Sequence, residues 1–133
     1  MADRYFSPAE VEALIPALSG IVDDVRKAHL EARALGEEMQ AEQRRITLVG
    51  GGLLDRRQWQ AMRQRLERLG QQVQEGLNRV MALGGVPKDV DLGLVDFPHL
   101  RDGRVVNLCW KFGEREIRFW HGLDEGYASR KLL

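Results

Sequence analysis

The chain has 133 residues, and 20 lysines and arginines balance 20 aspartates and glutamates, so its formal net charge is zero. Hydrophobic residues make up 44% of the chain and charged residues 30%, a globular composition that excludes a disordered chain. A neutral chain is also not expected to be captured as a whole by nucleic acid or by an anionic membrane. The length predicts a single domain over residues 1–133.

Two features of the sequence bear on location. The single cysteine cannot form an internal disulfide, which is typical of proteins in the reducing cytoplasm. The first residues lack the apolar core of an export signal, and the longest apolar stretch, residues 46–54, contains three glycines and is too short to span a membrane. We therefore expect a cytoplasmic protein that has no membrane partner.

The first predicted helix covers residues 7–45. Ser7 and Glu10 have the spacing of a capping box, in which each side chain bonds the backbone amide of the other residue. Apolar or small residues then alternate at spacings of three and four, which is the pattern of a coiled-coil seam. These residues are Val11, Leu14, Leu18, Ile21, Val25, Ala28, Ala32, Leu35 and Met39. Pro16 interrupts the seam, so we expect a kink or a short break there.

The second predicted helix covers residues 55–84, from a capping Asp55 to a terminal glycine pair. Its seam consists of Trp59, Met62, Leu66, Leu69, Val73, Leu77 and Val80. The glycine-rich residues 46–54 form the tip between the helices, so the two helices are expected to be antiparallel neighbours. Residues 8–43 carry eight acids and three bases, whereas residues 55–83 carry three acids and six bases, and this opposite charge favours their pairing.

A three-stranded antiparallel meander is predicted over residues 93–121, with tight turns at Asp102-Gly103 and Gly113-Glu114. The resulting register puts apolar residues on one face: Val95, Phe97, His99, Val106, Leu108, Trp110, Phe112, Ile117, Phe119 and His121. We expect this face to pack on the base of the hairpin, across Leu14, Ile15, Leu18, Val22, Leu77, Val80 and Met81. The predicted class is therefore α+β, a long coiled-coil-like helical hairpin followed by a β-meander and a tail over residues 122–133.

The first candidate site is formed by two histidines. In the predicted register His99 and His121 both face Val106, and a strand spacing of about 4.8 Å puts their Cβ atoms about 10 Å apart. With Asp124 from the following loop, they offer two imidazoles and a carboxylate, a set that suits a divalent transition metal. The plainer interpretation, which we favour, is that each histidine ends an apolar row and makes one hydrogen bond at the sheet margin.

The second candidate is the cysteine on the opposite, outer face. Cys109 is predicted to lie between Asp96, which raises the pKa of a neighbouring thiol, and Arg118, which lowers it. No histidine is expected beside it on that face, so the sequence does not support a Cys–His nucleophile. We favour the interpretation that Cys109 is a small strand residue flanked by an ion pair.

Trp120 and the arginines near the tip are further candidates for binding. Trp120 is predicted to be on the outer face, where the tail, which we favour, or another subunit or a ligand would cover it. The arginines could contact phosphates, but acids of the first helix compete for them, and we favour a solvated coiled-coil surface. These arginines are Arg44, Arg45, Arg56, Arg57, Arg63, Arg65 and Arg68.

The last third of the chain resembles a known family. The run from Asp91 to Pro98, followed by Leu108-Cys109-Trp110, Phe119-Trp120-His121 and Asp124-Glu125-Gly126, is similar to an uncharacterised bacterial family, the domain of unknown function 2203. The resemblance implies no activity or cofactor, because none is assigned to the family. It does imply a motif concentrated on Asp96, Cys109, Trp110, Glu114, Trp120, His121 and Arg130. With Arg118, the motif residues outside the apolar face predict a binding site formed by the outer face and the loops.

Three functions stay open. We expect a non-enzymatic interaction module that self-associates as a homodimer, because a two-helix arm with one seam is marginally stable alone. The alternative is a domain that binds a metal or a small ligand, as a binding protein or an enzyme, centred on His121 with His99 and Asp124. The third is nucleic-acid binding by the tip arginines, which we do not favour.

Overall fold

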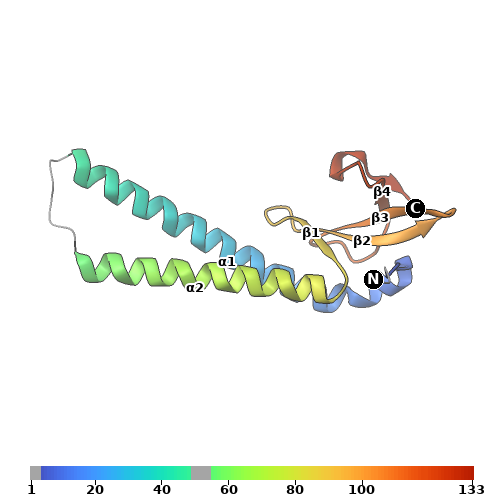
Figure 1. The fold of residues 1–133 in the computed structure, drawn as a ribbon, viewed down its shortest axis with the longest axis horizontal. Coiled ribbons are helices and arrows are strands. Elements are labelled where there is room, and N and C mark those ends of the chain that lie inside the picture. Colours follow the sequence, from blue (N-terminus) through green and yellow to red (C-terminus); the bar gives the residue numbers. More distant parts are fainter. Residues whose placement is uncertain (1–3, 49–54) are drawn as a thin grey trace.

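The structure, a computed structural model, describes residues 4–48 and 55–133. Two long antiparallel helices form an arm, and a five-stranded antiparallel sheet lies beside the base of this arm (Figure 1). The helices are α1 (Pro8–Leu48) and α2 (Arg56–Ala82). The predicted α+β class, a helical hairpin followed by an antiparallel sheet, is confirmed, with five strands in place of three.

The start of α1 follows the predicted capping box. The Ser7 backbone amide donates to Glu10 Oε1 over 3.0 Å, and the Glu10 amide donates to Ser7 Oγ over 3.1 Å. The helix then runs through Pro16 without the predicted short break. Ile15 and Leu18, on either side of the proline, are buried and hold this turn, so the backbone hydrogen bond that proline cannot make does not end the helix.

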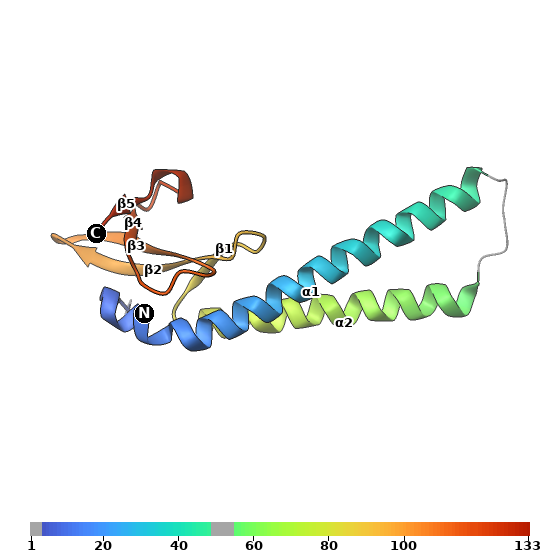
Figure 2. The ribbon, with the colours of Figure 1, turned by 180° about the vertical axis from the view of Figure 1, so that it is seen from behind.

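The second helix begins where the sequence predicts. The Asp55 side chain accepts from the backbone amides of Arg57 and Gln58, over 3.0 and 3.2 Å. At the other end Gly84 follows the last helical turn with a φ of 101°, a left-handed conformation that favours glycine. Most of the predicted tip, residues 49–54, lies outside the described residues, and the two helices diverge toward it (Figures 1 and 2).

The strands follow one another in the sheet in chain order. They are β1 (Val86–Asp89), β2 (Leu94–Arg101), β3 (Arg104–Lys111), β4 (Phe119–His121) and β5 (Lys131–Leu132). The predicted pairing of β2 with β3 is confirmed, with Phe97 opposite Leu108 and His99 opposite Val106. The outermost strands β1 and β5 were not predicted from the sequence, because both are short and carry charged residues.

The predicted register of β4 is wrong by one residue. Trp120, not Phe119, lies opposite Leu108, and His121 lies opposite Asn107 instead of Val106. Because side chains alternate between the faces of a strand, this shift moves His121 to the face opposite His99. It also moves Trp120 to the helix-facing side of the sheet, so its predicted place on the outer face is wrong as well.

The register shifts because the predicted two-residue turn is part of a longer loop between β3 and β4. Glu114 Oε1 accepts from the Lys111 amide over 2.6 Å, and the Glu114 carbonyl accepts from Trp110 Nε1 over 2.9 Å. Farther along, the Ile117 amide donates to Glu12 of α1 over 3.0 Å. Side chains thus satisfy backbone groups that a regular hairpin would pair between strands, and the connection accommodates the extra residue.

The main core lies between the sheet and the base of the arm. It contains Phe6, Val11, Ile15, Leu18, Ile21, Val22, Val25, Val80, Val95, Phe97, Leu108, Trp110 and Ile117. Leu14 and Leu77 pack against it as predicted, whereas Met81 has 51% of its surface exposed and does not belong to the cover. The predicted apolar face of the β2–β3 hairpin is therefore confirmed, and the opposite face is free to carry polar groups.

Candidate metal centre

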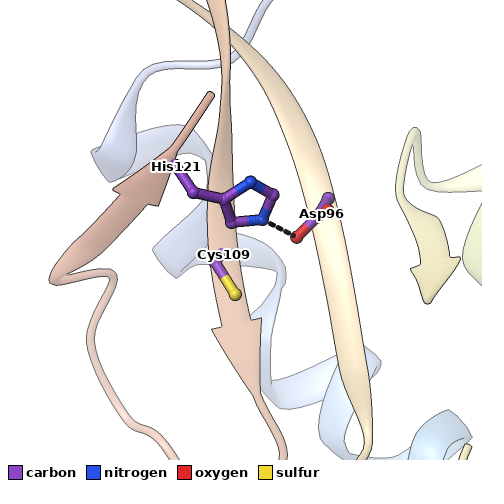
Figure 3. Close-up of side chains that lie close together, drawn as sticks. All are labelled: Asp96, Cys109 and His121. Atoms are coloured by element: carbon purple, nitrogen blue, oxygen red, sulfur yellow. Dashed lines mark hydrogen bonds and ion pairs between the residues drawn. The ribbon is translucent and has the colours of Figure 1, made fainter. Parts of the chain in front are cut away.

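Three chemically different side chains meet on the face of the sheet that points away from α1 (Figure 3). Asp96 comes from β2, Cys109 from β3 and His121 from β4, and their exposed fractions are only 2%, 1% and 2%. Each offers a metal-ligating atom, and these atoms all lie within 4.8 Å of one another. Three adjacent strands therefore place a carboxylate, a thiol and an imidazole in one buried cluster.

The imidazole of His121 is held through both of its nitrogens. Nδ1 lies 2.8 Å from the carbonyl oxygen of Gly122, and Nε2 lies 3.1 Å from Asp96 Oδ1. A carbonyl oxygen can only accept, so Nδ1 carries a proton and Nε2 is the nitrogen that faces the carboxyl group. His121 and Asp96 then share one further proton, and the pair is electrically neutral whichever atom holds it.

Cys109 is not an activated nucleophile in this environment. Burial, reinforced by the neighbouring Asp96 carboxylate, raises the pKa of its thiol to about 12. The thiol is therefore protonated near neutral pH, whereas nucleophilic cysteines have lowered pKa values. The sequence prediction that no histidine accompanies Cys109 on its face is wrong, but His121 directs Nε2 to Asp96 and does not activate the thiol.

This raised pKa predicts a loss of stability at alkaline pH. The unfolded thiol ionises near its ordinary value of 9.0, while the folded thiol keeps its proton up to about pH 12. Between these values the metal-free protein should lose up to about 1.4 kcal/mol of unfolding free energy per pH unit. Urea unfolding of the wild type and of Cys109→Ala checks this, because the variant keeps all other titrating groups; equal alkaline losses would contradict the prediction.

Two further residues of the sequence-predicted set border the cluster. Glu114 and Arg130 form an ion pair with Nη2 2.7 Å from Oε2, and Arg130 Nη2 also lies 3.3 Å from the Cys109 carbonyl oxygen. The structure therefore brings five of the predicted site residues into one region, namely Asp96, Cys109, Glu114, His121 and Arg130.

The other predicted site residues lie elsewhere. His99 Nδ1 is 2.6 Å from the Phe6 carbonyl oxygen on the helix side of the sheet, so His99 and His121 do not converge. Asp124 is exposed, at the edge of a surface hollow of about 720 Å³. Arg118 is exposed and lies 3.9 Å from Glu116. The centre of the Trp120 ring lies 4.7 Å from the Arg101 guanidinium carbon and 4.6 Å from Lys131 Nζ.

The dimensions of the cluster fit a small metal ion. For three atoms within 4.8 Å of one another, some point lies no farther than about 2.8 Å from each of them. Zinc binds sulfur at about 2.3 Å and imidazole nitrogen at about 2.0 Å, so side-chain shifts of about 0.5 to 0.8 Å would complete the contacts. A thiolate, an imidazole and a carboxylate are all established zinc ligands.

The fold and the cluster together define an α+β protein in which a helical arm supports a sheet with a buried Asp–Cys–His centre. The chain belongs to the family described as Uncharacterized conserved protein (DUF2203), whose model matches residues 4–133. The resemblance noted for the last third of the sequence is thus confirmed and extends over almost the whole chain. No curated protein and no solved structure matches it. Within residues 4–48 and 55–133, no helix combines the length and the apolar character needed to cross a bilayer.

Proposed function

We propose that this protein binds a divalent transition metal, zinc in particular, through Asp96, Cys109 and His121. The observation that carries the proposal is the convergence of three different ligand types, each at least 98% buried, within 4.8 Å of one another. Buried titratable groups are costly to keep unless they are paired or bind metal. A Cys–Asp–His set combines soft and hard donors, which favours zinc over calcium or magnesium.

Charge also favours a divalent ion. Without metal the cluster holds the thiol proton and the proton shared by Asp96 and His121, and its net charge is zero. Zinc replaces both protons, since its ligands are a thiolate, a carboxylate and a neutral imidazole, and the net charge is again zero. An ion of this charge enters without leaving an uncompensated charge inside the protein.

The test measures zinc bound per chain and its affinity. The purified full chain is stripped with a chelator, loaded with zinc, dialysed and assayed by elemental analysis, and its affinity is measured against a chromophoric chelator. We expect one zinc per wild-type chain and an affinity lowered by about 100-fold or more in Cys109→Ala and His121→Ala. Cobalt substitution should give a thiolate-to-metal charge-transfer band that disappears in Cys109→Ala.

His99→Ala is the matched control, because it removes the same side chain from the opposite face of the sheet. It should bind zinc as the wild type does. Failure of the wild type to bind any of zinc, cobalt or nickel would overturn the proposal, as would undiminished binding by His121→Ala. A reducing compartment such as the cytoplasm suits this function, because it keeps the Cys109 thiol available as a ligand.

The divergent arm supports a second candidate function, self-association as a homodimer. A hollow of about 480 Å³ opens between the helices and has an apolar floor formed by Ile21, Val25, Ala28 and Leu69. Its other lining residues are mostly charged or polar: Asp24, Lys27, Glu31, Gln72, Glu75 and Arg79. Nearer the tip, a smaller hollow of about 210 Å³ combines Trp59 and Met62 with the acidic side chains of Glu38, Glu42 and Asp55. Within the described part of the chain, Arg56, Arg57, Arg63 and Arg68 form no ion pair. A second copy of the chain would place such arginines beside the acidic residues of the smaller hollow. It would also place apolar side chains against the apolar floor of the larger hollow.

Charge reversal tests this second candidate through the mass measured by sedimentation equilibrium. Arg63→Glu with Arg68→Glu lowers the net charge of residues 55–83 from +3 to −1, and Glu38→Arg with Glu42→Arg raises the net charge of residues 8–43 from −5 to −1. We expect a wild-type dimer, weaker self-association of each variant, and a restored dimer when the two variants are mixed. A monomeric wild type at micromolar concentration would contradict this second candidate function, as would variants that both dimerise as strongly as the wild type.

A further inference from the structure

The last residues of the chain, 122–133, form what we name the C-terminal strap. The strap leaves β4 at His121 and returns through η1 (Tyr127–Ser129) to pair as β5 with β4. It lies on the side of the sheet away from the helical arm, which is the side that carries the buried cluster (Figures 1 and 2). The cluster is thus enclosed by the sheet on one side and approached by the strap on the other.

The strap is fastened at Arg130. Its Nη2 lies 2.8 and 2.7 Å from the two carboxylate oxygens of Glu114 and 3.3 Å from the Cys109 carbonyl oxygen. The guanidinium carbon also lies 4.0 Å from the centre of the Phe119 ring, next to the cluster in β4. Only 10% of the Arg130 side chain is exposed, so this charge-assisted contact is shielded from water. It therefore stabilises the closed strap more than a surface ion pair would.

A second set of contacts connects the strap to the candidate ligand His121. Lys131 Nζ lies 2.5 Å from Glu125 Oε1, which accepts from the Gly122 amide over 2.7 Å. The carbonyl of the same Gly122 accepts from His121 Nδ1. The orientation of the imidazole therefore depends on the conformation of the strap where it leaves β4.

The strap also has the properties of a segment that opens locally. Residues 123–129 are all exposed, and β5 is only two residues long. Within the described residues, Arg130 Nε is buried without a hydrogen-bond partner, a cost that opening to water would relieve. Segments with few buried contacts open at lower free energy than the whole domain unfolds.

We infer that the C-terminal strap is a gate over the buried cluster, and that release of the Arg130–Glu114 pair controls access to Cys109 and the entry and exit of the metal. The part that concerns the metal rests on the proposed function. Access to the thiol does not, because it can be measured on the metal-free protein.

The first experiment follows the reaction of the metal-free protein with an aromatic disulfide reagent. Cys109 is the only cysteine of the chain, so every reacted thiol reports on the cluster. Arg130→Gln should react about tenfold faster than the wild type at the same pH, because the charge-assisted contact that closes the strap is lost. Arg118→Gln is the matched control, because this arginine is exposed and its nearest acid is 3.9 Å away. The thiol of this variant should react at the same rate as that of the wild type.

The second experiment measures the transfer of zinc from the loaded protein to an excess of chelator. Arg130→Gln should release zinc about tenfold faster, while the equilibrium affinity changes less because entry is accelerated too. Glu114→Gln should act in the same way, and the double variant should add little to either single change, because both remove one contact.

Denaturant separates gating from general destabilisation. Opening of the strap exposes little surface, so the thiol rate should be almost independent of low urea concentrations, whereas a rate set by global unfolding would rise steeply. A steep rise, or an unchanged thiol rate in Arg130→Gln, overturns the gate. A faster thiol reaction in a protein that binds no metal supports the gate and overturns only the proposed metal function.

Discussion

Replacing Asp96 with alanine is expected to lower the unfolding free energy of the metal-free protein by about 3 kcal/mol. The carboxyl group is 98% buried and is the partner of His121 Nε2, and it also lies beside the Cys109 thiol. Alanine leaves a polar imidazole nitrogen in the protein interior with nothing to bond. Urea denaturation followed by circular dichroism measures the loss.

Two companion variants show whether this loss comes from the stranded histidine. Asp96→Asn keeps the size and a hydrogen-bonding group at this position, so it should cost less, about 1 kcal/mol. The double variant Asp96→Ala with His121→Ala should be more stable than the sum of its single changes predicts, because removal of both partners leaves no orphaned group. Additive losses would show that the pair does not stabilise the fold in this way.

Replacing Trp110 with alanine is expected to cost about 3–5 kcal/mol, the largest loss among the side chains discussed. Its indole is completely buried in the main core, and its ring lies edge-on to Phe112 with 6.3 Å between ring centres. Its Nε1 also donates to the Glu114 carbonyl over 2.9 Å, which helps to hold the loop after β3. Thermal and urea unfolding both report this change.

Trp110→Phe separates the two contributions, since phenylalanine fills most of the space and cannot donate to Glu114. Trp110→Phe should lower the unfolding free energy by less than Trp110→Ala does, but it should still loosen the loop after β3. Trp120→Ala is a control of equal size change, because Trp120 is only half-buried and its loss should be smaller. Equal losses at both tryptophans would contradict the position of Trp110 at the centre of the core.

The parts of the fold that local sequence signals govern were predicted well. The capping box at Ser7 and the cap at Asp55 depend on neighbouring residues and form as expected. The turn at Asp102-Gly103 adopts positive φ angles of 51° and 78°, as a tight hairpin requires, and this fixes the pairing of β2 with β3. Short-range chemistry thus determines both helix starts and one hairpin register.

The candidate site could not be placed from the same signals. The loop before β4 is held by Glu12, which is distant in sequence, and by the Glu114 side chain, and neither contact follows from turn propensities. One additional residue in this loop decides whether His121 lies with His99 or with Cys109. The family motif did contain Asp96, Cys109 and His121 together, and this was the signal in the sequence that pointed to the observed cluster.

The three ligand residues come one from each of three consecutive strands, and they are spaced thirteen and twelve residues apart in the chain. An ion bound by all three residues would cross-link these strands and close two short loops of the chain. The arm contributes none of the three ligands, but the main core joins the sheet to the base of the arm. Loading would therefore raise the melting temperature of the sheet and of the helix base together, and this temperature would depend on the concentration of free zinc.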